Sequence, residues 1–362
     1  MMNHIFVGID LGDKNSVARI AVDREKSERF GFQNNRQGRS RLFLEVKKKS
    51  EGAGGAQIVM AYEASSCGYV LRDEAEAMGM RCWVLAPTKM EKSVEQRQHK
   101  NDDRDADDVL EKIRGHVLAG NRLPKVWVPD VQTRDDRELI RARLEVTEKQ
   151  TEIKAQIRML TKRHGLEKPS GIGSGWTIGY RRWLEALGGS EQPLGWSTRQ
   201  ALQSLLRQLN FLEAEIERLQ KPVEQLAQEA RHKTIVEELT REAGVGVLTA
   251  MVYRTEIGQA GRFHRSRQVG KFVGLTPTSH ESGQQTDRKG HISRQGPPRL
   301  RKVLCQASWV HIIHDRDAGR MYQRLVSRNP KKKKIALVAI MRRLAVRLWH
   351  RMRKIELQQA AA

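Results

Sequence analysis

The chain has 362 residues, of which 38% are hydrophobic and 30% charged, enough for two or three domains with a sizeable core. Its 66 Lys and Arg exceed its 43 Asp and Glu, and the formal net charge of +23 predicts a polyanionic partner. No apolar run approaches the ~20 residues that span a bilayer, and the N-terminus lacks the pattern of a secretory signal. We therefore expect a cytoplasmic protein with no membrane partner. Cys67, Cys82 and Cys305 are too far apart to indicate a disulfide framework or a zinc site.

Residues 1–130 have the pattern of a mixed α/β domain. We predict strands at residues 5–9, 16–22, 29–32, 57–63 and 81–85, and helices at 39–49 and 69–78. Three strands, helix, strand, helix, strand is the order of a RuvC-like (ribonuclease-H-like) nuclease domain. Asp10 ends the first apolar strand and Glu63 ends the fourth, so the two would be neighbours in such a sheet.

An acidic stretch at residues 102–108 follows this pattern. A helix that begins after Asn101 places Asp102 and Asp105 on one face, three residues apart. Carboxylates brought together in this way can hold Mg²⁺, with Mn²⁺ as a substitute. Aspartates near a helix start are also common as caps, dipole partners or solvated surface residues. Together with Asp10 and Glu63, they predict a four-carboxylate metal site.

Residues 131–232 read as a coiled-coil region. Leu139, Val146, Ile153 and Leu160 recur every seven residues, and a second heptad series follows at 202–226. Between them, a Gly- and Trp-rich insertion at 168–197 reads as an irregular connector whose tryptophans pack locally. The heptads fit either a helical hairpin within the chain or pairing between subunits, and we favour subunit pairing.

Residues 233–362 read as a mainly helical, basic module. Residues 251–362 hold twenty-five Lys and Arg against six Asp and Glu, which is +19 of the net charge. Because aromatic residues make up only 5% of the chain, we expect salt-sensitive contacts to nucleic-acid phosphates rather than base stacking. Glycines between two helical stretches resemble a helix-hairpin-helix, whose backbone N–H groups face a phosphate. The candidate nucleic-acid-binding residues are Gly244, Gly246, Arg262, Arg265, Arg267, Lys271, Arg288, Arg294, Arg299 and Arg301.

Ser282 lies in a polar Ser-Gly turn among these arginines, where a hydroxyl could meet a phosphodiester. A turn-forming role is the more common one for a loop serine. A final helix at about 331–354 has apolar residues on one side and arginines on the other.

At this point the chain resembles a known family, the DEDD transposases and recombinases of bacterial insertion sequences (the insertion-sequence 110/1111 group, with the Piv-like invertases). The order of several short motifs carries the resemblance. They are Gly8-Ile9-Asp10, Glu63, Lys100-Asn101-Asp102-x-x-Asp105-Ala106, Gly244-x-Gly246-x-x-Thr249-Ala250, Gly274-Leu275-Thr276-Pro277, Ser282-Gly283 and Ile292-Ser293-x-x-Gly296.

The resemblance implies a RuvC-like domain, a coiled coil and a C-terminal transposase domain that cut and exchange DNA strands. It implies Asp10, Glu63, Asp102 and Asp105 as the acidic set and Ser282 as the serine that becomes linked to DNA. Ser293 is the second candidate for this nucleophilic serine, and Ser279 is the third. It also implies two nucleic-acid partners, which are double-stranded DNA of the element junction and target and a guide RNA encoded by the element. We further predict a dimer, or a tetramer on DNA, in the bacterial cytoplasm at the nucleoid.

Two rival functions remain open from the residues. In a plain RuvC-like resolvase the same acids activate water to cut branched DNA, and Ser282 is a turn residue. In a nucleic-acid-binding protein with an inactive nuclease fold, Asp10 and Glu63 have no part in strand cutting.

Overall fold

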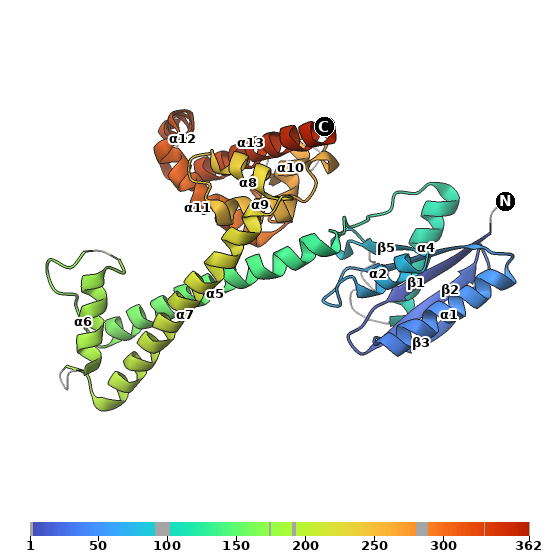
Figure 1. Cartoon of the computed structure of the whole chain (residues 1–362), viewed down its shortest axis with the longest axis horizontal. Helices are drawn as coiled ribbons and strands as arrows, with labels where there is room; N and C mark the ends of the chain where they lie inside the picture. Colours follow the sequence, from blue (N-terminus) through green and yellow to red (C-terminus); the bar gives the residue numbers. More distant parts are fainter. Residues whose placement is uncertain are drawn as a thin grey trace. The chain divides into compact units, whose positions relative to one another are not determined.

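The structure, a computed structural model, describes residues 3–90, 102–173, 175–189, 193–279, 289–328 and 330–361. The chain divides into two compact units, Met1–Val128 and Pro129–Ala362 (Figure 1). The first is a mixed α/β unit and the second is mainly helical, which confirms the expected α/β plus helical composition. Across the described ranges, no helix is long and apolar enough to cross a membrane.

The first unit is built on a five-stranded sheet. Its strands are β1 (His4–Asp10), β2 (Asn15–Val22), β3 (Glu28–Gln33), β4 (Gln57–Glu63) and β5 (Arg81–Leu85). Their spatial order is β3-β2-β1-β4-β5. The first three strands are antiparallel neighbours, whereas β4 runs parallel to β1 and β5 parallel to β4. All five strands lie within two residues of their predicted positions.

Helices cover both faces of this sheet, because its strands bury side chains on each side. On one face, α1 (Arg36–Gly52) and α2 (Val70–Ala77) pack Leu42, Phe43 and Leu71 against the strands. On the other face, α4 (Asp102–Ala119) packs Val109, Leu110 and Ile113. The Asn35 side chain caps α1 by accepting a hydrogen bond from the Gly38 N–H at 2.8 Å. A short 3₁₀ turn, η1 (Pro87–Lys89), follows β5.

The second unit begins with two long helices, α5 (Val131–Arg163) and α7 (Trp196–Gln228), which lie side by side (Figure 1). The heptad leucines pack within the chain, since Leu202 and Leu209 share one buried cluster with Ile153 and Ile157. The seam that we interpreted as a subunit interface is therefore used by an intramolecular hairpin. In the first half of α5 the buried apolar positions are Ile140 and Leu144 rather than the predicted Leu139 and Val146.

The insertion between these helices is not wholly irregular, because it contains α6 (Ile178–Gly189). Trp176 and Trp183 pack locally around Tyr180, whose ring centroid lies 5.3 Å from that of Trp176 and 5.4 Å from that of Trp183. Trp196 instead remains exposed at the start of α7, so the expectation of local packing is wrong for it. The apolar face of α6 explains the helix: Tyr180, Leu184 and Leu187 recur at helical spacing and are buried.

The rest of the second unit is a helical bundle with a small hairpin. Its elements are α8 (Lys233–Thr240), α9 (Val247–Ile257), η2 (Ala260–Arg262), α10 (Ser266–Phe272), β6 (Pro277–Ser279), β7 (Lys289–Ile292), α11 (Pro298–His314), α12 (Arg316–Arg328), η3 (Pro330–Lys332) and α13 (Lys333–Ala361). The strands β6 and β7 form an antiparallel pair and lie on either side of residues 280–288 in the sequence. Leu344, Leu348 and Trp349 of α13 lie in a core that also takes in Ile140 and Leu226 of the long hairpin.

Candidate functional site

Asp10 and Glu63 lie at the same edge of the sheet. Strands β1 and β4 are parallel, and their register pairs Ile9 with Tyr62, so the next residue on each strand is one of the two acids. Both acids are half-buried. The carboxyl ends of parallel strands are where ligands meet an α/β sheet. The predicted neighbourhood of Asp10 and Glu63 is therefore present in the structure.

Helix α4 packs closely on β1 two residues before Asp10, because β1 has a glycine at that position. A Cβ atom on Gly8 would lie 2.3 Å from the Ala106 carbonyl oxygen and 2.4 Å from the Leu110 nitrogen. Only a residue without a side chain permits this approach. Asp105 immediately precedes the buried Ala106, lies one turn before the buried Val109, and is itself half-buried. Asp102 begins the helix, and its side chain lies outside the described residues.

Two other acids of the same stretch have different roles. Asp103 forms an ion pair with Arg29 of β3 at 2.7 Å, and Asp107 pairs with Arg19 of β2 at 2.8 Å. Asp107 also accepts a hydrogen bond from the Ser27 hydroxyl at 2.9 Å. Burial alone would raise the pKa of Asp107, but these hydrogen bonds and the Arg19 charge outweigh it and lower the pKa below its usual value. Asp103 and Asp107 thus tie α4 to β2 and β3, on a different face from Asp105.

The acids at the sheet edge are suited to a hard divalent cation. Carboxylate oxygens from β1, β4 and α4 are the donors that Mg²⁺ prefers. Carboxylates that converge repel one another unless a cation offsets their charge. Within the described residues, the group whose ligand atoms all lie within 4.8 Å of one another is a different one, Glu242, His311 and Asp315 of the second unit. Sequence reasoning missed this group because Glu242 is far in the chain from His311 and Asp315.

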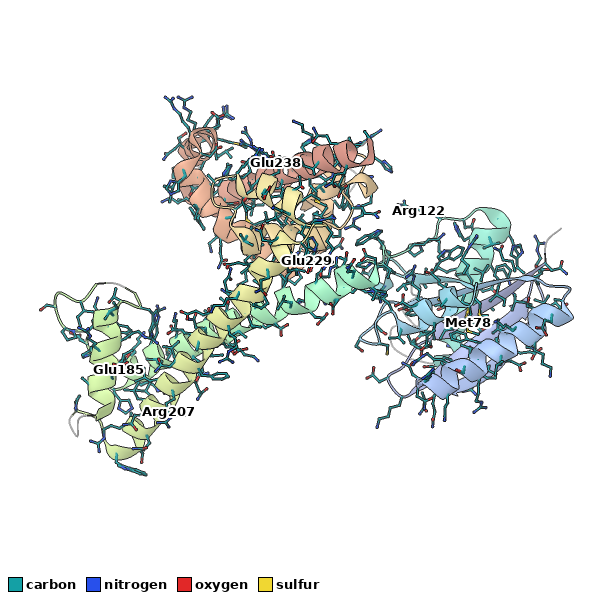
Figure 2. The ribbon with its side chains drawn as sticks, viewed as in Figure 1. Met78, Arg122, Glu185, Arg207, Glu229 and Glu238 are labelled. Atoms are coloured by element: carbon teal, nitrogen blue, oxygen red, sulfur yellow. The ribbon has the colours of Figure 1, made fainter. Side chains whose placement is uncertain are left out.

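Arginines already supply the positive charge in that second cluster. Arg347 Nε donates to Glu242 at 2.8 Å, and its Nη1 lies 3.3 Å from Asp315. Arg351 pairs with both Glu242 and Glu238, the α8 acid labelled in Figure 2. His311 Nδ1 donates to the Ala243 carbonyl at 3.0 Å. Two guanidinium groups would repel a metal ion, so we interpret the cluster as an ion-pair network that joins α8, α11 and α13.

Arg262, a predicted phosphate contact, is instead part of the fold. Its guanidinium lies 4.4 and 4.5 Å from the ring centroids of Phe263 and Phe272. Its Nε donates to the Ile257 carbonyl at 2.8 Å. Burial lowers its pKa to about 10. We therefore remove Arg262 from the set of phosphate-binding candidates, because its donors face backbone carbonyls and not solvent.

Three further candidates also have partners in the protein. Arg301 donates to the Gly296 carbonyl at 2.8 Å and to the Val273 carbonyl at 3.2 Å. Arg299 pairs with Glu145 of α5 at 2.5 Å. Gly244 has a positive φ of 85°, and a Cβ atom there would lie 2.4 Å from the Ala307 carbonyl oxygen. This glycine lets the turn between α8 and α9 pack on α11.

The remaining candidates face solvent or lie outside the described ranges. Arg265, Arg267, Lys271 and Arg294 are exposed, and so is Gly246 at the N-terminus of α9. Ser282 and Arg288 belong to residues 280–288, outside the described part of the chain. The hydroxyl oxygen of Ser293 is buried and has no hydrogen-bond partner. A hydroxyl in that position cannot reach a phosphodiester without a conformational change.

Comparison with known proteins bears on both units. A model of the DEDD transposases of the IS110 type, described as "Transposase", matches residues 7–164, from β1 to the end of α5. A second model, described as "Transposase IS116/IS110/IS902 family", matches residues 236–323. The two matches together span about two thirds of the chain. This chain is a member of the IS110 family of insertion-sequence transposases.

Relatives of this transposase extend the similarity to nearly the whole chain. It is 28% identical over 338 residues to y4qE of Sinorhizobium fredii, named as a transposase, which covers 91% of this chain and 78% of the relative. It is 26% identical over 245 residues to the transposase for insertion sequence element IS1111A of Coxiella burnetii, covering 66% of this chain and 61% of that protein. The transposase for IS1533 of Leptospira borgpetersenii is 21% identical over 308 residues, 77% of this chain and 84% of its own length.

Proposed function

We propose that this transposase cuts and rejoins DNA strands through a covalent link between Ser282 and a DNA phosphate. The observation that supports the proposal is the adjacent placement of Asp10 and Glu63 by the parallel pair β1–β4, together with the close packing of α4 on β1 at Gly8. This is the arrangement expected of a RuvC-like nuclease domain. The family's DNA chemistry needs such a site to stabilise charge on a phosphodiester.

The predicted carboxylates would hold the metal of the reaction. Asp10, Glu63, Asp102 and Asp105 would bind Mg²⁺, which supplies charge stabilisation at the scissile phosphate. Asp103 and Asp107 pair with arginines instead, which supports the choice of Asp102 and Asp105 as the metal ligands of α4. The second cluster, at Glu242, is a weaker metal candidate because Arg347 and Arg351 occupy it.

The serine would conserve the energy of the broken bond. The Ser282 hydroxyl attacks phosphorus, loses its proton, and forms a phosphoserine bond while one DNA oxygen departs and takes up a proton. The freed hydroxyl of a second strand then attacks the phosphoserine and restores Ser282. One phosphodiester is thus exchanged for another, and no nucleotide triphosphate is required.

The basic unit would hold the nucleic acids. Exposed Arg265, Arg267 and Lys271 lie on and just before α10, and the exposed N-terminus of α9 offers backbone N–H groups to a phosphate. We propose that these groups bind the DNA of the element junction and target, together with the element's own guide RNA. Omitting the RNA from the reaction tests its role: strand transfer that proceeds at full rate without it would contradict that part of the proposal.

Self-association would bring the two parts of the reaction together. Because the leucine seam is used within the chain, a subunit contact on the long hairpin would use its outer faces, where Met159 and Phe211 are exposed. We propose a dimer that forms a tetramer on DNA, in which the acids of one subunit meet Ser282 of another. Light scattering with and without element DNA measures the subunit count directly.

Denaturing electrophoresis tests the covalent step. The full chain is mixed with labelled element-junction DNA, element RNA and Mg²⁺, and wild type is compared with Ser282→Ala. We expect the label to remain on wild-type protein and to be absent from the variant. Ser293→Ala serves as the matched control, because its buried hydroxyl should not be needed for the link. Cut DNA without labelled protein in any sample would instead favour a nuclease that uses water.

A further inference from the structure

A cavity of about 890 Å³ lies in the second unit between the β6–β7 hairpin, α12 and α13. Its volume is in the range of sites that enclose a small organic ligand. Pro277 and Ile292 line it from the hairpin, Met321 from α12, and Ile335, Val338 and Val346 from α13. Among the described phosphate-binding candidates, Arg294 alone lines this cavity. A charged side chain does not explain the apolar residues of the lining.

Helix α13 presents two apolar faces, of which one is buried in the core and the other is only partly covered. Leu337, Ile340, Leu344 and Leu348 are buried in the bundle, as predicted. Ile335, Val338 and Val346 lie on the adjoining face, at steps of three and eight residues, and line the cavity. Ile335 keeps 62% of its surface exposed. An apolar strip that the fold leaves at the surface is typical of a binding site.

The charges around the cavity have one sign. Five of its lining residues are Lys or Arg, and no Asp or Glu is among the described lining residues. Arg343 donates to the Met321 sulfur at 3.2 Å, and Arg342 lies against Gly270 of α10, next to the exposed Lys271. A smaller hollow shares Met321 and Arg343 and is lined further by Arg320, Arg324 and one acid, Asp317, of α12. Basic side chains on α10 and α12 therefore lie near the apolar cavity.

We propose that this cavity receives one nucleotide of the element DNA, extruded from its base stack. The aliphatic face of α13 and Ile292 would take the base, while Lys334, Arg342 and Arg343 take the phosphates beside it. An acidic peptide or free phosphate would use the cations and leave the apolar strip without a function. The inference rests on the proposed strand exchange, because β6 and β7 bracket Ser282 in the sequence, and an unstacked strand is easier to cut and exchange.

Fluorescence of 2-aminopurine tests the proposal, because this base brightens when it leaves the stack. The probe is placed at successive positions across an element-junction duplex, which is mixed with the full chain and element RNA in Ca²⁺, so that no cutting is required. We expect a several-fold rise at one position with wild type. Ile335→Asp, which sets a carboxylate at the mouth, should abolish the rise. Leu357→Asp is the matched control, since Leu357 is on the same helix, 61% exposed and outside the cavity, and should preserve it.

A second pair of variants keeps the test independent of folding. Lys334→Glu should lower the fluorescence rise, whereas Lys354→Glu, an equal charge change at an exposed site on α13, should not. Ser282→Ala separates the two proposals, because it should lose the covalent link and keep the rise. No rise at any position in bound DNA, or equal rises in Ile335→Asp and Leu357→Asp, would overturn the inference. So would a rise seen only when the probe is in the element RNA.

Discussion

The start of α4 concentrates acidic residues, and the region around α10 and α11 concentrates arginines. The two regions differ in what decides the partner of each charged side chain. On α4 the acids are separated by helix face, with Asp103 and Asp107 paired with arginines of β3 and β2 and Asp105 on a different face. Around α10 and α11 the arginines are separated by burial. Arg262 and Arg301 donate to backbone carbonyls, whereas Arg265 and Arg267 face solvent.

This difference teaches where a count of charges is a good guide to a binding site. Along a helix the period of 3.6 residues fixes which charges share a face before any tertiary contact forms. The turn η2, which carries Arg262, is too short to set such a period, and there the carbonyl groups left without partners decide that the arginine is drawn inward. Charge alone therefore overestimates the nucleic-acid surface of the second unit.

The largest expected effect separates the acids of α4. Asp105→Asn should slow strand cutting by about 10²- to 10³-fold, the usual loss when one charge-stabilising group leaves a site. Asp103→Asn, on the same helix, removes an ion pair with Arg29 that is largely in solvent, and should leave the rate near that of wild type. The rate of DNA cutting in Mg²⁺ measures both. Similar losses in the two variants would mean that helix face does not distinguish these acids.

Gly8→Ala should have the next largest effect, on stability. The new methyl group would overlap the Ala106 carbonyl, so α4 must shift from β1, at a cost of about 1–3 kcal/mol in the free energy of unfolding. Gly31→Ala is the control in the same sheet, because its Cβ would meet only the Arg29 side chain at 3.5 Å. Denaturant unfolding compares them. Equal stability of both variants would show that α4 does not depend on the close approach.

Arg262→Ala should mainly reduce stability, whereas Arg267→Ala should mainly change DNA binding. Loss of Arg262 leaves carbonyl groups without donors and should lower the free energy of unfolding by about 1–3 kcal/mol. Loss of the exposed Arg267 should change stability by less than about 0.5 kcal/mol. It should instead reduce the salt dependence of DNA binding by about one phosphate contact. Binding titrations at several salt concentrations provide the comparison, and an unchanged slope for Arg267→Ala would remove it from the interface.

The smallest expected effect is a pH dependence at the second cluster. Burial tends to raise the pKa of Asp315, but the Ala318 N–H, His311 and Arg347 lower it below its ordinary value. A lowered pKa in the folded state stabilises the fold above the ordinary pKa of the carboxyl group, and this contribution is lost as the pH falls through the lowered value.

Asp315 also caps α12, since it accepts from the Ala318 N–H at 2.8 Å. Asp315→Asn should therefore cost about 1 kcal/mol or less near neutral pH, because Asn still caps a helix but lacks the charge. The difference from wild type should shrink in acid. Unfolding curves recorded from pH 7 to acid check the sign, and a difference that grows toward low pH would contradict the assignment.

The sequence by itself determined the parts of this protein that depend on local period. Alternating apolar residues predicted the five strands, and the heptads predicted α5 and α7. The parallel pairing of β1 and β4 followed from the strand–helix order, and with it the shared edge of Asp10 and Glu63. The strands and helices were predictable because neighbours in the sequence define them, and the pairing of β1 with β4 because the order of the elements indicates it.

Only the tertiary structure decided what depends on distant partners. Whether the leucine seam closes within the chain, whether Arg262 faces phosphate or carbonyl, and which elements meet around Ile335 are set by surfaces far apart in sequence. Residues 289–314 illustrate the reason: β7 and α11 are short or weakly patterned segments, and β7 is fixed by pairing with β6. Burial, not local propensity, selects among such alternatives, because the free energy of packing appears only when the partners are in place.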